Sequence, residues 1–455
     1  MWPQISFLDA HRLWADWSSL DLGSCFCEPV DSITIEELAA HWDTLLAMNS
    51  RWNPNELYSL SRDKIYTVYS YVKGCLGREG IEVAIFSESP HHPFNYLIYV
   101  ASRILGIEVV MFSQSIIPDR IAVTTGVAEL PIYFEGRHRS MSPSETEAIR
   151  DKAPEISILV SEVRKRFSAL ETKPAYMVHH KRKQDATIAV EPRLRHLFRP
   201  RMYWRYLKEA WRRVRYRYLN DPRTILKREY DRLVSPTAEE PYVLVALHYQ
   251  PERTTNPEGG IFEAQALLIR LLAATLPPSF QICVKEHPTQ FNFCFPGHLS
   301  RSVELYKSLS LIPNLRFIDA EQPASRWAKN AEIIVTVNGT IGFEAAIIGK
   351  PVIAFGSPPY TGFPNVHIAK HHRELKELLA EILTEKRVSV ETNDDEVFRY
   401  LAALHSVTFP GYINPSYIQY SKLSSDTVAS SFVSGVKVAL GLYSDPNNLE
   451  KVRRN

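Results

Sequence analysis

The segment Val335–Gly356, VTVNGTIGFEAAIIGKPVIAFG, predicts a strand, a tight turn, a helix and a second strand in succession. The apolar run Ile333–Val337 is short and β-branched, which is typical of a buried strand, and Pro351–Phe355 is a second run of this kind. Between them, Ile341–Ile348 has the length of about two helical turns and stops at Gly349. The sequence therefore predicts a β-α-β unit with a glycine-containing turn at the start of its helix.

The turn Asn338-Gly339-Thr340 places no bulky side chain at this helix start. Unpaired backbone N–H groups and the helix dipole make such a start favourable for a phosphate. Glu344 lies about one turn into the helix, where a carboxylate can accept hydrogen bonds from ribose hydroxyls. The alternative is an ordinary β-α-β unit whose glycines only permit close packing, because a glycine-rich turn alone is a weak motif.

Length and composition indicate a soluble globular protein of more than one domain. The chain has 455 residues, 45% of them hydrophobic and 23% charged, and such a length favours two cores. Five cysteines are few and odd in number, and the N-terminus lacks the basic-then-apolar pattern of a signal peptide. No apolar run reaches the ~18 residues of a membrane span. We therefore expect a reduced, cytoplasmic location.

Strand and helix patterns alternate in two separate parts of the chain, which predicts an α/β fold with two parallel sheets. The first series is Ile81–Ser87, Phe94–Leu105 and Ile107–Phe112, and the second runs from Tyr242 to Phe355. We expect four regions: an N-terminal Rossmann-like domain (1–180), a basic helical segment (181–235), a C-terminal Rossmann-like domain (236–410) and a helical tail (411–455).

The segment Lys181–Arg232 is strongly basic, with seventeen Lys and Arg residues against six Asp and Glu residues, and aromatic residues lie between the charges. Three hypotheses fit it: contact with an anionic membrane surface, contact with a polyanion such as nucleic acid, or a helical insertion whose aromatics pack on the first domain. We do not expect nucleic acid as a partner, because nothing else in the chain matches a nucleic-acid module.

Polar residues follow three strands of the second series, and loops at the carboxyl ends of parallel strands lie on one rim of a sheet. The first loop holds Gln250, Glu252 and Arg253, and the third is the turn described above. The second loop is Lys285-Glu286-His287-Pro288, in which the histidine can bind a phosphate or protonate one. In the first domain, Glu88 follows a strand, where it is either a catalytic carboxylate or a residue that complements a helix dipole.

The motifs VKEHP (Val284–Pro288), YQPE (Tyr249–Glu252) and TVNGTIGFEAAIIGKPVIAFG (Thr336–Gly356) resemble those of bacterial capsule and surface polysaccharide biosynthesis proteins. More narrowly, they are similar to capsule-type Kdo transferases and to sialyltransferase-like enzymes with a His-Pro motif. The resemblance implies a GT-B fold, in which two Rossmann-like domains face each other across a cleft and the C-terminal domain binds the sugar nucleotide. It covers residues 240–365 well and Ile81–Gln114 loosely.

The resemblance also implies roles for individual residues. His287, followed by Pro288, would contact the donor phosphate, and Gly339, Thr340 and the helix start after Asn338 would hold the same phosphate. Glu344 would bind ribose. Independently of the resemblance, Lys285 at the end of its strand is an anion-binding element. Gln250, Glu252 and Arg253 would line the donor site, and Glu88 would be the catalytic carboxylate of the first domain. No cofactor and no metal ion are expected, because protein cations and backbone amides would neutralise the single phosphate of a CMP-linked sugar.

The sequence thus predicts a glycosyltransferase that moves a sugar from a nucleotide donor to a capsule or surface glycan or glycolipid acceptor. The expected sugar is a CMP-activated acid sugar such as Kdo. The enzyme would work in the cytoplasm, at the inner face of the membrane if the basic segment contacts lipid. Two alternatives stay open: a nucleotide-sugar epimerase of the same fold, and a non-catalytic subunit that binds a glycan or a partner enzyme.

Overall fold

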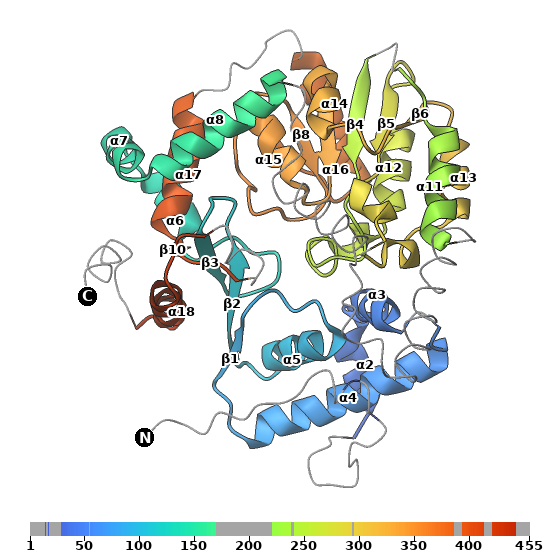
Figure 1. The fold of residues 1–455 in the computed structure, drawn as a ribbon. Helices are drawn as coiled ribbons and strands as arrows, with labels where there is room; N and C mark the ends of the chain where they lie inside the picture. Colours follow the sequence, from blue (N-terminus) through green and yellow to red (C-terminus); the bar gives the residue numbers. More distant parts are fainter. Residues whose placement is uncertain are drawn as a thin grey trace, which may run out of the picture.

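The computed structural model describes Trp14, Trp17 and residues 29–53, 55–169, 221–237, 241–293, 295–385, 394–413 and 421–442. In these residues the chain forms two β-sheets with helices around them (Figure 1). The predicted α/β architecture with two sheets is therefore confirmed. Most of the basic segment, residues 181–220, lies outside the described residues, and so do the residues of the C-terminal tail beyond 442.

Six parallel strands form the larger sheet, in the order β6-β5-β4-β7-β8-β9. The chain runs outward from β4 to β6 and then returns to the other side of β4 as β7. In this doubly wound order the topological switch point lies between β4 and β7, and open α/β sheets bind their ligands at such points. The strands are β4 (Tyr242–Ala246), β5 (Gln281–Lys285), β6 (Leu315–Ile318), β7 (Ile333–Thr336), β8 (Val352–Ala354) and β9 (Val366–Ile368).

Helices cover both faces of this sheet because alternate strand residues point to opposite sides. Val243 and Val245 of β4 pack in one core and Tyr242 and Leu244 in the other. The first core includes α11 (Pro222–Leu233), α12 (Ala266–Thr275), α13 (Val303–Ser310) and α16 (His372–Glu385). The second includes α8 (Pro154–Ala169), α14 (Ala324–Asn330), α15 (Thr340–Ile347) and α17 (Asp394–Ser406). The predicted unit around Gly339 is confirmed as β7-α15-β8.

The smaller sheet is mixed rather than parallel throughout. Its order is β1-β2-β3-β10, and only β1 and β2, which are joined by helix α5 (Pro93–Ile104), are parallel. The link from β2 to β3 covers only residues 115–119, which is too short for a crossover, so β3 pairs antiparallel with β2. The strands are β1 (Val83–Phe86), β2 (Glu108–Gln114), β3 (Arg120–Thr124) and β10 (Phe409–Pro410).

An N-terminal helical layer packs beside this sheet. It consists of α2 (Ser32–Ala39), α3 (Trp42–Trp52), α4 (Tyr58–Arg78) and α5, and these helices share a core with Trp14. The chain between α2 and α3 is interrupted only by residues 40 and 41. Helices α6 (Phe134–Ser140) and α7 (Pro143–Lys152) lead from the smaller sheet to α8.

Two segments cross between the halves of the molecule, so the described structure does not follow the expected division at residues 180 and 410. Helix α8 comes from the N-terminal part of the sequence, yet it packs on α14 and α15 of the larger sheet. Strand β10 pairs with β3 of the smaller sheet, and α18 (Ser425–Ala439) packs against both strands. The end of the described chain therefore completes the first half of the molecule instead of forming a separate tail (Figure 1).

The last residues of the predicted basic segment form helix α11, which belongs to the core of the larger sheet. Leu226 and Tyr230 are buried there, while Arg228 and Arg232 are exposed. This part of the segment packs on the second half of the chain and not on the first. No helix among the described residues is long and apolar enough to cross a membrane.

Candidate functional site

A cavity of about 480 Å³ lies at the carboxyl ends of the central strands of the larger sheet. Loops after β4, β5, β6 and β7 all contribute to its wall, which places it at the switch point between β4 and β7. Its volume is in the range of small-molecule sites. Polar and charged side chains in its wall are Arg166, His248, Tyr249, Glu252, Thr254, Lys285, Glu286, His287, Thr289, Glu321, Gln322, Ser325, Thr336, Asn338, Thr340 and Glu344.

The three polar loops predicted from the sequence meet at this cavity, as the parallel sheet requires. A fourth loop, Glu321–Ser325 between β6 and α14, also lines it and was not predicted. Eight of the residues proposed from the sequence lie in the wall, although their roles stay predictions. They are Glu252, Lys285, His287, Pro288, Asn338, Gly339, Thr340 and Glu344.

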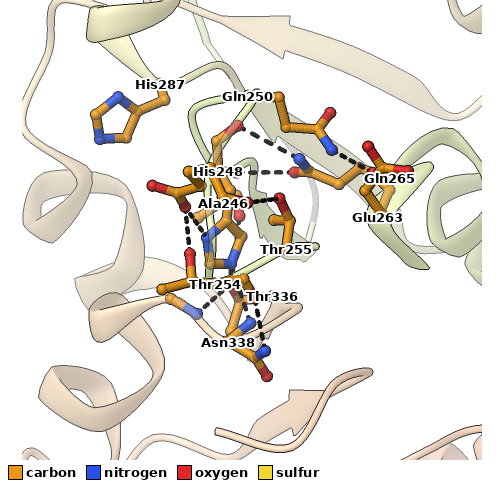
Figure 2. Close-up of polar contacts among 12 residues, drawn as sticks. Ala246, His248, Gln250, Thr254, Thr255, Glu263, Gln265, His287, Thr336 and Asn338 are labelled. Carbon is orange, nitrogen blue, oxygen red and sulfur yellow. Dashed lines mark hydrogen bonds and ion pairs between the residues drawn. The ribbon is translucent and has the colours of Figure 1, made fainter. Parts of the chain in front are cut away.

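His248, which sequence reasoning left without a role, joins the first loop to the third. Its Nε2 accepts a hydrogen bond from the backbone N–H of Asn338 at 3.0 Å (Figure 2). Its Nδ1 lies 2.9 Å from Oε1 of Glu252. Because Nε2 accepts, the ring is neutral and its proton is on Nδ1, which donates to the carboxylate. Both ring nitrogens have hydrogen-bond partners, so His248 holds the first and third loops together instead of serving as a base.

Glu252 is a half-buried carboxylate that remains charged. Burial raises its pKa, but hydrogen bonds from His248 and from Thr254, whose hydroxyl donates at 2.5 Å, outweigh that effect and leave the pKa below its usual value. The negative charge of Glu252 therefore persists at neutral pH beside His287.

His287 is held as a neutral hydrogen-bond donor. It begins the short helix η4 (Pro288–Phe291), and its Nδ1 accepts from the backbone N–H of Thr289 at 3.2 Å. The ring proton is therefore on Nε2. Burial lowers the pKa of His287 to about 4, although the charge of Glu252 opposes this shift. At neutral pH the site thus offers an N–H group rather than an imidazolium, and Figure 2 shows His287 apart from the bonded cluster around His248.

A buried ion pair fixes the backbone at His287. The side chain of Glu286 is fully buried, and its Oε1 accepts the backbone N–H of His287 at 2.9 Å. Its Oε2 accepts from Nε of Arg301 at 2.8 Å and from the hydroxyl of Tyr306 at 2.7 Å. Arg301 also donates to the carbonyl of His248 at 3.1 Å. The network thus connects the second loop to the first, and nothing local in the sequence indicates Arg301 or Tyr306 as its members.

The helix start after β7 is formed by closely packed groups. Gly339 is the N-cap of α15 and has no side-chain cap. A Cβ at this position would meet Oγ1 of Thr336 at 2.6 Å, the same atom that accepts the backbone N–H of Gly339 at 3.2 Å. The hydroxyl of Tyr360 donates to the carbonyl of Gly339. Glycine is therefore required here for close approach of the backbone, which leaves the first N–H groups of α15 uncovered by a side chain.

Lys285 and Glu344 line the cavity but already have protein partners. The Lys285 ammonium is buried and donates to the carbonyl of Ala320 at 2.8 Å. Glu344, the expected ribose ligand, forms an ion pair of 2.9 Å with Arg166 of α8. Burial raises the pKa of Glu344, and the charge of Arg166 opposes this effect.

Three residues proposed for the site lie outside the cavity wall. Gln250 is buried, and its side chain accepts from Arg301 and donates to the carbonyl of Glu263 at 2.5 Å, so it braces the first loop from behind. Arg253 and Glu88 lie 3.7 Å apart and form an ion pair between the two halves of the molecule. Arg253 also approaches Glu258, at 3.6 Å. Among the described residues, no group of three His, Cys, Asp or Glu side chains is placed to hold a metal ion.

Comparison with known proteins places more than half of the chain in one protein family. Residues 139–375, just over half of the chain, match the model of the family described as capsule polysaccharide biosynthesis protein. No curated protein matches the chain. The matched residues include α8, β4 to β9 and the loops that line the cavity.

Solved structures with a similar arrangement include two from Thermosulfurimonas dismutans KpsC. Its beta Kdo 2,7 transferase is 11% identical over 80% of this chain and 86% of that chain, with a TM-score of 0.30. Its beta Kdo 2,4 transferase is 14% identical over 71% of this chain and 78% of that chain, with a TM-score of 0.33. The UDP-GlcNAc 2-epimerase from Neisseria meningitidis is 12% identical over 77% of this chain and 81% of that chain, with a TM-score of 0.30.

The resemblance predicted from VKEHP and from the glycine turn is thus confirmed at the level of the family. Because the matched residues carry the switch-point cavity and span more than half of the sequence, the chain belongs to the capsule polysaccharide biosynthesis protein family.

Proposed function

We propose that this protein is a glycosyltransferase that takes a sugar from a nucleotide donor, a CMP-activated acid sugar such as Kdo, and adds it to a capsule or surface glycan or glycolipid. The observation that supports this proposal best is the switch-point cavity, where the helix start of α15 and the N–H donor of His287 lie in one wall. Backbone amides and a neutral imidazole N–H are suited to a phosphate, and a phosphate leaves with the nucleotide when the sugar is transferred.

In this proposal the residues of the cavity bind and orient the donor. His287 donates from Nε2 to a phosphate oxygen and stabilises the charge that develops on the leaving nucleotide. Gly339 permits close approach of a ligand to the helix start, Thr340 offers its backbone N–H to the same phosphate, and Glu344 accepts from ribose hydroxyls. The negative charge of Glu252 raises the pKa of His287, and this favours protonation of the imidazole when an anion binds.

Nucleotide release tests the proposal directly. Purified protein is incubated with CMP-Kdo, CMP-sialic acid and UDP-sugars, with and without a lipid-linked acceptor, and with EDTA in a parallel series. Release of CMP that requires the acceptor and persists in EDTA is the expected result. Interconversion of UDP-sugars without an acceptor would instead identify an epimerase and contradict the proposal.

Replacement of His287 provides a sharper test of the site. His287→Ala is expected to lower turnover about 10- to 100-fold, the value of one hydrogen bond to a charged group. The melting temperature should change little, because the ring packs at the cavity wall and not in a core cluster. Full activity in this variant would exclude the phosphate role.

A non-catalytic glycan-binding or partner-binding subunit is the second candidate, and the position of Glu88 favours it. This carboxylate forms an ion pair with Arg253 outside the cavity wall, so the role of catalytic carboxylate has no support from its geometry. Nucleotide binding without turnover on any donor and acceptor pair would identify this second function.

We also propose that the basic segment Lys181–Arg232 holds the enzyme at an anionic membrane surface, where a lipid-linked acceptor is available. The proposal rests on the excess of Lys and Arg in the sequence. Charge reversal at Arg212, Arg213 and Arg215 should release the protein from vesicles of anionic lipid in a sedimentation assay. Sedimentation equal to that of the wild type would leave this segment with a packing role only.

A further inference from the structure

Arg166 reaches the cavity from a part of the chain that the sequence assigns to the other half of the molecule. Helix α8 covers one face of the larger sheet, and its Val163 and Phe167 are buried in that core. Arg166 lies on the same helix and lines the cavity, where it forms the ion pair of 2.9 Å with Glu344. The core packing of α8 therefore fixes where this guanidinium enters the site.

The charges of the wall show why such a cation matters. Four carboxylates of the described residues line the cavity, namely Glu252, Glu286, Glu321 and Glu344, and of these Glu286 is already neutralised by the buried Arg301. His248 and His287 are neutral, which leaves Lys285 and Arg166 as the positively charged side chains of this wall. The Lys285 ammonium is buried and already donates to a backbone carbonyl. An anionic phosphate in this wall therefore depends on Arg166 for much of its charge compensation.

The hydrogen bonds of Arg166 are incomplete in the described structure. Its Nη1 contacts Glu344, while its Nε is buried and has no hydrogen-bond partner among the described residues. A buried N–H donor without a partner is unfavourable, and a phosphate can accept from two guanidinium N–H groups at once. Glu344 lies one helical turn, about 6 Å, from the start of α15. A flexible arginine side chain can cover that distance.

We propose that Arg166 is a donor-binding residue that exchanges partners when the nucleotide enters. In the empty cavity Glu344 holds the guanidinium in place. When the nucleotide binds, its ribose hydroxyls take over the carboxylate of Glu344, and Arg166 turns to the phosphate at the start of α15. This inference rests on the proposed function, because it requires a nucleotide in the cavity.

A comparison of nucleotides with nucleosides tests the exchange. Calorimetry measures the affinity of CMP and cytidine, and of UMP and uridine, for the wild type and for Arg166→Ala. We expect the monophosphate to bind about 10- to 100-fold more weakly to the variant, as for the loss of a charge-assisted bond, while nucleoside affinity changes less than about twofold. Arg166→Lys should recover part of the loss. Arg166→Gln removes the charge but can still donate to Glu344, and it replaces the alanine variant if that one is unfolded by circular dichroism.

Arg164 supplies the matched control on the same helix. It forms an exposed ion pair with Asp394, outside the cavity wall, so Arg164→Ala should leave both affinities unchanged. Equal losses for nucleoside and monophosphate in the Arg166 variants would show a structural ion pair and overturn the exchange, and so would unchanged affinities. A wild-type protein that binds none of the monophosphates would overturn the proposed function, and this inference with it.

Discussion

Replacing Glu286 by Gln should destabilise the larger sheet far more than a change of one charge on the surface does. The side chains of Glu286 and Arg301 are 0% and 3% exposed, and their contact is 2.8 Å. Glutamine keeps the shape of the side chain but removes its charge, so the guanidinium stays buried without a counter-charge. Loss of one partner from such a pair costs about 3–5 kcal/mol. For a lobe of ordinary domain size this lowers the melting temperature by roughly 6–20 °C.

The matched control is an ion pair of the same chemistry at the surface. Arg164 and Asp394 are in contact at 2.5 Å, but their side chains are 42% and 58% exposed. Because solvent screens such a pair, Asp394→Asn should cost about 1 kcal/mol or less. Differential scanning fluorimetry of both variants at the same pH and salt concentration measures the difference.

The result that would refute this reasoning is a Glu286→Gln variant that melts within about 2 °C of Asp394→Asn, since burial would then have no effect. A second readout is available because Glu286 also accepts the backbone N–H of His287. Glu286→Gln should therefore weaken binding of nucleoside monophosphates, whereas Asp394→Asn should not. Loss of stability without loss of affinity would restrict the pair to a structural role.

Two further predictions concern His287 and Gly339. The pKa of His287 in the folded protein is lowered to about 4. The unfolded chain therefore binds more protons between pH 6.5 and pH 4, and the protein loses stability as the pH falls through this window. At pH 5 the loss is about 2 kcal/mol. The melting temperature of His287→Gln should therefore fall less between pH 7 and pH 5 than that of the wild type. An equal fall in both proteins would contradict the burial of a neutral ring. Gly339→Ala should destabilise the protein by about 1–3 kcal/mol, because its Cβ would meet Thr336 at 2.6 Å. Gly77→Ala in α4, where a Cβ meets nothing within 4 Å, is the control and should be neutral or stabilising. Equal shifts in melting temperature for both variants would exclude a steric clash at Gly339.

Much of the larger sheet could be predicted from the sequence because its strands and helices are locally encoded. Within the predicted series from Tyr242 to Phe355, the structure has strands over Gln281–Lys285 and Leu315–Ile318 and a helix over Ala324–Asn330. Short β-branched runs alternate there with amphipathic segments, and a parallel sheet places the following loops on one rim. The meeting of the three loops at one cavity follows from that topology alone.

The partners of the site residues could not be predicted, because they come from distant parts of the chain. Gln250 has the polar character of a ligand-binding residue, but Arg301, fifty-one residues later, holds it in the interior. Glu88 and Arg253 neutralise each other across the two halves. The short strands β3 and β9 were missed, since the hairpin after β2 and the pairing of Val366–Ile368 with β8 depend on tertiary contacts.

Helix α8 packs on the larger sheet although it precedes residue 180, and it carries Arg166 into the cavity. If the chain were divided at residue 180, the larger sheet would keep the carboxylates of the cavity but lose Arg166, which compensates one of them. The helix is anchored by Ile156, Val160, Val163 and Phe167 in the core of that sheet, so its position does not depend on the smaller sheet alone. A fragment that begins after α8 would therefore carry a cavity with excess negative charge, and it should bind a phosphate poorly even if its sheet folds.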